Sequence, residues 1–246
     1  MLLKACLNGG TTRDNHPSVP QTPLELAADA AAVVAAGAGA VHMHPRDNDG
    51  AESLDPDFVL PAVAAVRAAI PAPVGVTTGL WAVNGDVTRR MSLVEGWAGS
   101  DLPDFASVNF SEPGAAELAD LLAGLGVPVE AGIWSPDDAD RLAASGFAGH
   151  LLRILVEPRD RTLEGAVALA AAIDDALDRH GFTAPRLHHG YGPATWPVLR
   201  QAVRRGRDIR IGLEDTVVLE DGSQARGNRE LVEAAARLVA ESAPES

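Results

Sequence analysis

Short apolar runs alternate eight times with alanine-rich segments of helical character along the 246 residues. We predict the apolar runs to be strands, covering residues 2–7, 40–44, 74–77, 105–110, 127–133, 150–156, 186–189 and 209–213. Helices are predicted after them at 23–37, 56–70, 89–97 and 113–126, from 136 onward, and at 163–180, 195–205 and 229–242. Strands that alternate with helices favour a parallel sheet, because a parallel neighbour needs a crossover connection.

Eight strand–helix units in a chain of this length predict an α/β fold, a (β/α)₈ barrel in which residues 1–246 form a single domain. The alternative is an open doubly wound sheet, which usually has fewer strands. Two helix starts are well marked. Thr22, Pro23 and Glu25 have the spacing of a capping box with a favoured proline, and Ser135 precedes Pro136 in the same way.

Barrel enzymes carry their active sites at the carboxyl ends of the strands. Strands 40–44 and 209–213 would be separated only by the first strand around a closed barrel, so their polar ends should converge. The polar residues at the predicted strand ends are Asn8, His42, His44, Thr77, Thr78, Ser107, Asn109, Glu130, Glu157, His188, His189, Glu214 and Asp215.

His42 and His44 are two residues apart on a predicted strand and therefore face the same side. A carboxylate from Glu214 would complete a two-histidine, one-carboxylate set that holds a divalent metal and leaves a position open for substrate. This donor set suits zinc, with manganese, iron or nickel as alternatives. The non-metal interpretation is a pair of histidines bonded to backbone and a solvated carboxylate.

Other polar strand ends supply groups for binding and proton transfer. Asp215 remains available as a base if Glu214 binds the metal. Hydroxyl, amide and backbone donors could hold a carboxylate or enolate oxygen, although serine and threonine are also ordinary helix caps. These donors are Thr77, Thr78, Gly79, Ser107 and Asn109. One of His188 and His189 could face the mouth of the barrel, or both could serve packing.

Charge and composition disfavour several kinds of partner. The net charge of −14 disfavours nucleic acid and anionic membranes. No apolar run reaches the roughly 20 residues of a membrane span, and the first residues lack a signal-peptide pattern. Cys6 is the only cysteine, so no intrachain disulfide can form, and we expect it in the core. The expected location is the cytoplasm.

Six segments, in this order, resemble the β-keto acid cleavage enzymes, which include 3-keto-5-aminohexanoate cleavage enzyme. The resemblance covers nearly the whole chain. The segments are Cys6-Leu7-Asn8-Gly9, His16-Pro17-x-x-Pro20-x-Thr22-Pro23, His42-x-His44-x-Arg46-Asp47, Thr77-Thr78-Gly79, Ser107-Val108-Asn109 and Gly212-Leu213-Glu214-Asp215.

The resemblance implies a (β/α)₈ barrel that binds zinc and forms a homo-oligomer, a tetramer or a dimer. It implies conversion of a β-keto acid and acetyl-CoA into acetoacetate and a new acyl-CoA by Claisen and retro-Claisen chemistry, which is an acyltransferase reaction. By position, His42, His44 and Glu214 match the zinc ligands, and Asp215 with Arg210 matches the base and its partner. Thr77 and Ser107 match catalytic positions beside the substrate, and Asn8, Thr78, Gly79 and Asn109 are expected to bind substrate.

Two departures from the family bear on the substrate. Some members carry a glutamate just after the first strand, whereas this chain has Gly10-Thr11-Thr12-Arg13, which favours a neutral or acidic β-keto acid over an amine. The chain is also short for the family. A basic rim for the CoA phosphates could come from arginines near strand ends, which are Arg13, Arg46, Arg89, Arg90, Arg159 and Arg161.

Two other classes of function stay open from the sequence. A zinc-dependent aldolase or hydrolase on the same barrel would use the metal and Asp215 without CoA. A metal-stabilised binding protein would need a closed site with four protein ligands, whereas the sequence supplies three. Arg210 lies five residues before Asp215, so it reaches that carboxylate only if its side chain runs up the barrel or the strand end bends.

Overall fold

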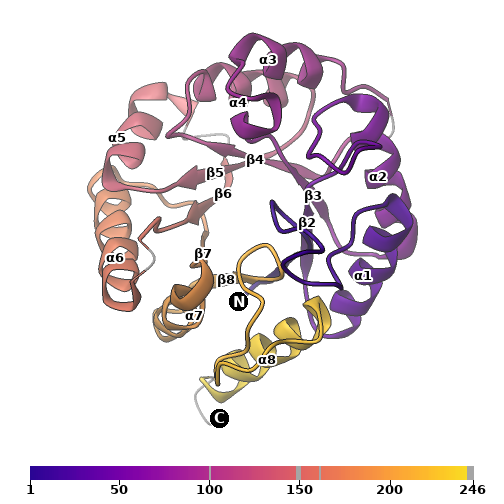
Figure 1. The fold of residues 1–246 in the computed structure, drawn as a ribbon. Coiled ribbons are helices and arrows are strands. Elements are labelled where there is room, and N and C mark those ends of the chain that lie inside the picture. The colour runs from indigo at the N-terminus through magenta and orange to yellow at the C-terminus, as the bar shows by residue number, and fades with distance from the viewer. Residues whose placement is uncertain (100, 148–150, 161, 243–246) are drawn as a thin grey trace.

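The eight strands close into one parallel barrel in chain order, from β1 to β8 and back to β1, and helices surround it (Figure 1). The structure is a computed structural model that describes residues 1–99, 101–147, 151–160 and 162–242. The predicted barrel is confirmed. The strands are β1 (Leu3–Cys6), β2 (Ala40–Met43), β3 (Val74–Thr77), β4 (Phe105–Asn109), β5 (Val129–Ile133), β6 (Leu151–Val156), β7 (Arg186–His188) and β8 (Asp208–Ile211).

A helix follows each strand, and two short 3₁₀ helices precede the helices after β3 and β7. The predicted start of β6 at His150 lies outside the described residues. The helices are α1 (Pro23–Ala35), α2 (Pro56–Ala69), η1 (Leu80–Val83), α3 (Val87–Glu95), α4 (Ala115–Gly124), α5 (Pro136–Ser145), α6 (Leu163–Arg179), η3 (Gly192–Ala194), α7 (Thr195–Arg204) and α8 (Asn228–Glu241).

Side-chain caps determine where several helices begin. Thr22 and Glu25 form the predicted capping box at α1, and Ser135 with Asp138 forms another at α5. Helix α3 starts two residues earlier than predicted, because the Asp86 side chain accepts a hydrogen bond from the backbone N–H of Arg89. The residues at the start of α3 are mostly polar, so the hydrophobic pattern of the sequence does not mark where this helix begins.

The main apolar core lies between the strands and the helices, and the barrel interior is polar at its floor. Val41, Val76 and Val108 belong to the core, whereas Lys4 and Glu130 form a fully buried ion pair at 2.5 Å inside the barrel. Arg153 also reaches Glu130, at 3.1 Å. Glu130 sits near the start of β5, so its assignment to the mouth was wrong. The strand begins at Val129, and Glu130 therefore lies low in the barrel.

Strand order places the ends of β2 and β8 on either side of β1. Cys6 pairs with His42 on one side of β1, and Ala5 pairs with Ile211 on the other. The loops after β1 and β8 lie beside each other over the centre of the barrel, joined by a hydrogen bond from Thr11 Oγ1 to the Leu213 carbonyl at 2.8 Å (Figure 1). Among the described helices, none is long and apolar enough to cross a membrane.

Candidate active site

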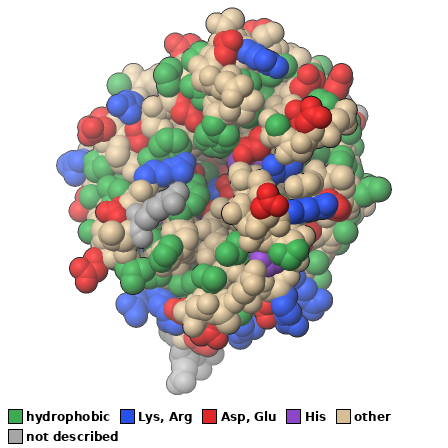
Figure 2. Space-filling view, in the orientation of Figure 1, with side chains coloured by type: hydrophobic (Ala, Val, Ile, Leu, Met, Phe, Trp, Pro, Cys, Tyr) green, Lys and Arg blue, Asp and Glu red, His purple; other side chains and the backbone are tan. Residues whose placement is uncertain are grey.

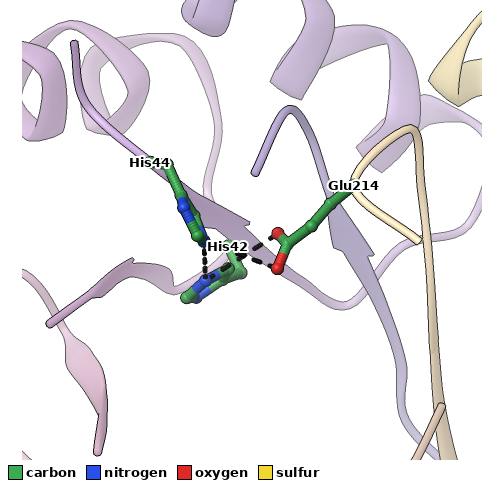
Figure 3. Close-up of side chains that lie close together, drawn as sticks. All are labelled: His42, His44 and Glu214. Carbon is green, nitrogen blue, oxygen red and sulfur yellow. Dashed lines mark hydrogen bonds and ion pairs between the residues drawn. The ribbon is translucent and has the colours of Figure 1, made fainter. Parts of the chain in front are cut away.

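His42, His44 and Glu214 converge at the mouth of the barrel (Figure 3). Each residue offers one ligand atom, and these atoms all lie within 4.8 Å of one another. The two Nε2 atoms are 3.2 Å apart, and those of His42 and His44 lie 3.9 and 3.4 Å from the Glu214 carboxylate. The structure thus brings together the three residues that the sequence proposed as metal ligands.

The chemistry of this cluster fits a divalent cation. Glu214 Oε2 is buried and has no hydrogen-bond partner among the described residues. Burial and neighbouring cations hold the pKa of His42 well below its usual value, so its imidazole is neutral as a metal ligand must be. Burial would also lower the pKa of His44, but the carboxylates of Glu214 and Glu52 raise it to about 9. The carboxylates of Glu214 and Glu52 therefore favour a positive charge beside them, which a proton on His44 or a bound metal ion would supply.

Glu52, which the sequence analysis missed, orients His44. Its Oε2 lies 2.5 Å from His44 Nδ1 and accepts a hydrogen bond from Trp81 Nε1 at 2.8 Å. With Nδ1 facing a carboxylate, Nε2 is the nitrogen that remains for a metal. Glu52 lies in the loop after β2, where Arg46 and Glu52 form an isolated bridge. No spacing in the sequence marks this turn.

Asn8 and Gly9, at the end of β1, position the two metal-ligand segments. Asn8 Nδ2 donates to the carbonyls of His44 and Pro20 at 2.8 and 3.2 Å, and its Oδ1 accepts from the N–H groups of His44 and Gly9. These bonds leave the Asn8 amide no free group for a substrate. Gly9 has φ +52°, and a Cβ there would collide with the Glu214 side chain.

Arg210 reaches both carboxylates that follow β8. Its guanidinium is buried, contacts Glu214 Oε1, and donates to Asp215 Oδ1 at 2.8 Å and Oδ2 at 3.3 Å. Burial would raise the pKa of Glu214, but Arg210 and His44 outweigh it and hold that pKa well below its usual range. The side chain of Arg210 therefore runs up the barrel, and the predicted contact with Asp215 is present.

His189 adds a second buried group beside Asp215. Its Nδ1 lies 3.3 Å from Asp215 Oδ1, and its Nε2 lies 3.3 Å from Glu157 Oε1. His188 instead faces helix α6, with Nε2 3.5 Å from Asp174 Oδ1. Strand alternation sends neighbouring side chains to opposite faces, so only one of the pair could point inward. The structure shows that this residue is His189.

The predicted donors on β3 and β4 lie next to one another, since Thr77 pairs with Ser107 in register. Thr77 Oγ1 accepts from the Gly79 N–H at 3.0 Å, and Thr78 Oγ1 donates to the Ser107 carbonyl at 2.5 Å. Asn109 Nδ2 donates to Glu112 Oε1 at 3.0 Å. These bonds order the strand ends, and the contacts of these residues with a substrate stay a prediction.

A pocket of about 410 Å³ opens above the metal-ligand cluster. Figure 2 shows a hollow near the centre of this face, where acidic, basic and histidine side chains are visible. Trp81 packs over Gly79, where a Cβ would collide with the indole ring. The residues that line the pocket are Gly10, His44, Glu52, Trp81, Trp134, Arg159, Tyr191 and Glu214.

Three of the six arginines predicted to form a basic rim for CoA phosphates contact other parts of the protein instead. Arg46 donates to the carbonyls of Gly9 and Thr11, and Arg90 bonds Glu112 in the interior. Arg13 pairs with Glu25 on α1. The remaining arginines differ in position: Arg159 lines the pocket, Arg89 is exposed on α3, and Arg161 lies outside the described residues.

Comparison with known proteins agrees with this geometry. Residues 1–245 match the family model described as beta-keto acid cleavage enzyme. The chain belongs to the β-keto acid cleavage enzyme family. The general reaction of this family is the acetyl-CoA-dependent cleavage of a carbon–carbon bond in a β-keto acid.

Curated relatives are similar over almost the whole chain. The 3-keto-5-aminohexanoate cleavage enzyme of Fusobacterium nucleatum subsp. nucleatum is 25% identical over 98% of this chain and 92% of its own length. That of Acetoanaerobium sticklandii is also 25% identical, with the same two coverages. Both relatives therefore match this β-keto acid cleavage enzyme along its full barrel.

Solved structures of ObcA share the barrel fold. The ternary complex of ObcA with a C4-CoA adduct and oxalate has a TM-score of 0.72 and 20% identity, and the match covers 92% of this chain and 64% of ObcA. The binary complex of ObcA with oxaloacetate has a TM-score of 0.70 at 20% identity, covering 90% of this chain. This chain spans 63% of ObcA in that match, less than two thirds of its length.

Proposed function

We propose that this enzyme uses zinc at His42, His44 and Glu214 to transfer the acetyl group of acetyl-CoA to the two-carbon fragment cleaved from a β-keto acid. The products are acetoacetate and a new acyl-CoA, which makes the enzyme an acyltransferase. The observation that carries this proposal is the convergence of three ligand atoms within 4.8 Å beneath a pocket, in a chain of this family.

Three protein ligands leave room for a substrate oxygen. A bound zinc ion would supply a Lewis acid that polarises the keto group of the substrate. His44 is held for this by Glu52 on one side and by Asn8 through its backbone on the other. Glu214 is held by Arg210. Two of the three ligands, His44 and Glu214, are thus fixed by neighbours before any substrate arrives.

Asp215 is the proposed base. Arg210 donates hydrogen bonds to both of its oxygens, and His189 approaches the same carboxylate from β7. Asp215 would accept the proton from the carbon that forms the new bond. Thr77 and Ser107, paired on β3 and β4, would orient the carboxylate and enolate oxygens of the substrate.

Isotope labelling tests the reaction. Zinc-loaded protein is mixed with acetyl-CoA labelled in the acetyl group and with a panel of β-keto acids, and the acetoacetate is analysed by mass spectrometry. We expect the label in the terminal acetyl carbons of acetoacetate, together with an acyl-CoA that retains the acyl group of the keto acid. Product formed without acetyl-CoA would contradict the proposal and favour an aldolase or hydrolase reaction.

Two further proposals accompany this function. We infer a homo-oligomer, a tetramer or a dimer, from the family resemblance, and a cytoplasmic location from the single cysteine, which rules out an intrachain disulfide. Light scattering of the purified protein and fractionation of cells test these proposals separately.

A further inference from the structure

We propose that Arg159, held between Trp134 and Tyr191, binds a second carboxylate at the far end of the β-keto acid. The inference rests on the proposed function, because it takes the pocket above His42, His44 and Glu214 as the substrate pocket. It names a substrate class, the β-keto diacids.

The guanidinium of Arg159 lies over two aromatic rings. Its central carbon lies 3.8 Å from the centroid of the Trp134 ring and 4.7 Å from that of the Tyr191 ring. Cation–π contacts of this kind fix the plane of a guanidinium while its N–H edges stay free for an anion. The side chain is 40% exposed, so this plane is held open to solvent at the pocket.

The cradle around Arg159 is itself anchored. Tyr191 donates a hydrogen bond to Glu157 Oε2 at 3.2 Å, and its ring meets the His189 ring edge-on at 5.1 Å. Arg159 Nη2 contacts the same Glu157 oxygen at 3.3 Å. Among the described residues, this is the only ion pair of Arg159, so most of its five N–H donors remain for a ligand.

Aromatic residues are scarce in this chain but concentrate at this pocket. The whole sequence has four tryptophans and one tyrosine, and two of these tryptophans, Trp81 and Trp134, line this pocket together with Tyr191. Arg159 is the only arginine or lysine among the described residues that line it, and the other ionisable groups near the metal ligands there are His44, Glu52 and Glu214. The pocket therefore has a histidine and two carboxylates on the side of the metal ligands, and a guanidinium held by two aromatic rings away from them.

The size of the pocket favours a substrate carboxylate over a CoA phosphate as the partner of Arg159. The same space of about 410 Å³ contacts His44 and Glu214, so one small molecule can reach both the metal ligands and the guanidinium. The phosphates of CoA are separated from its thioester by the whole pantetheine arm. A planar guanidinium also matches a carboxylate with two parallel hydrogen bonds.

A matched pair of substrates tests this assignment. The pair is a six-carbon β-keto diacid and the same compound with its distal carboxylate blocked as a methyl ester, compared on zinc-loaded protein. We expect Arg159→Met to lower the ratio of kcat/KM for diacid over ester by about tenfold or more, since hydrogen bonds to a charged group are lost. The same ratio for Arg159→Lys should lie between that of the wild-type enzyme and that of Arg159→Met. Arg200, 43% exposed and paired with Glu220 on the outer surface, provides the control Arg200→Met, which should keep the ratio.

Binding measurements separate this inference from the proposed function. Calorimetric titration of the zinc-loaded protein with diacid or ester, without acetyl-CoA, measures the two affinities directly. The preference for the diacid should decrease from the wild-type enzyme through Arg159→Lys to Arg159→Met. If no acetoacetate forms but Arg159 still determines the preference for the diacid, the proposed reaction fails and the carboxylate site stands. An unchanged preference in both Arg159 variants overturns the site. So does a rise in KM for acetyl-CoA but not for acetyl-pantetheine in Arg159→Met, which would assign the guanidinium to a CoA phosphate.

Discussion

One carboxylate oxygen of Glu52 holds His44 in place, at 2.5 Å from His44 Nδ1, while accepting a hydrogen bond from Trp81 Nε1. The ring of Trp81 also stacks on that of His44, with centroids 6.2 Å apart. A single residue from the loop after β2 thereby connects the metal-ligand cluster to the wall of the substrate pocket. The rotamer of His44 and the position of Trp81 should change together when Glu52 is altered.

Glu52→Gln should weaken metal binding without unfolding the protein. The amide lacks the charge that favours Nδ1–H of His44, and its single oxygen must serve both His44 and Trp81. We expect the zinc affinity to fall by about 10- to 100-fold, as is typical of partners behind a metal ligand. Competition with a chromophoric chelator measures this. Glu95→Gln, on the exposed surface of α3, is the control, and equal affinities in both variants would refute the role of Glu52.

Asn8→Asp should destabilise the protein although the two side chains have the same shape. The carboxylate would place an oxygen against the carbonyls of His44 and Pro20, where Asn8 now donates at 2.8 and 3.2 Å. We expect the free energy of unfolding to fall by about 2–4 kcal/mol, because buried acceptors lose their donors. Urea denaturation provides the measurement. Asn48→Asp at an exposed loop position should change it by less than about 0.5 kcal/mol.

Asp215→Asn should abolish most turnover while the metal stays bound. The amide cannot act as the base, but it keeps the shape of the side chain beside Arg210. We expect kcat to fall by about 100- to 10,000-fold with zinc content unchanged. Steady-state kinetics and metal analysis of the same sample make the test. Turnover close to that of the wild-type enzyme would show that another group takes the proton.

Asp29 should make the protein less stable as the pH rises from about 4 to 6. Burial raises the pKa of Asp29 from 3.8 to about 6, and the hydrogen bond from Asn228 only partly opposes this. In this window the unfolded chain releases the proton and the folded chain keeps it, so stability falls with pH and stays lower above 6. Asp29→Asn should therefore stabilise the protein at pH 7.5 by about 1–2 kcal/mol. This is less than the free energy that corresponds to the full pKa shift, because Asp29 is only half-buried.

Denaturation curves at pH 3.5, 5 and 7.5 measure this effect. The gain in the free energy of unfolding caused by Asp29→Asn should be absent at the lowest pH and complete at the highest. Asp14→Asn, at an exposed position in the loop after β1, is the control. A gain that is the same at all three values would assign the effect to packing rather than to ionisation.

Much of the fold could be predicted from local sequence, because each strand and helix carries its own pattern. The capping box at Thr22 and the proline at Pro136 mark helix starts directly. The limits of α3 and β5 were less accurate. The start of α3 depends on Asp86 in a polar stretch, and an apolar run around Glu130 gives no sign of where the strand begins.

The convergence of His42, His44 and Glu214 could be predicted because barrel closure alone brings β2 and β8 near each other. Glu52 could not, since its contact with His44 depends on the path of an irregular loop. The same reason applies to Trp134 and Arg159, which meet only because the loops after β5 and β6 turn toward one another. Asn8 was assigned to substrate, but all its hydrogen bonds are made within the protein.

The central claim is that His42, His44 and Glu214 hold the metal that supports CoA-dependent cleavage. Its most direct test is a titration of metal-free protein with zinc, in which the rate of acetoacetate formation from acetyl-CoA and a β-keto acid is followed. We predict a rate that rises in proportion to zinc, levels off near one equivalent per chain, and stays at background in His42→Ala. Full activity without metal, or the same zinc-dependent rise in His42→Ala, would contradict the account.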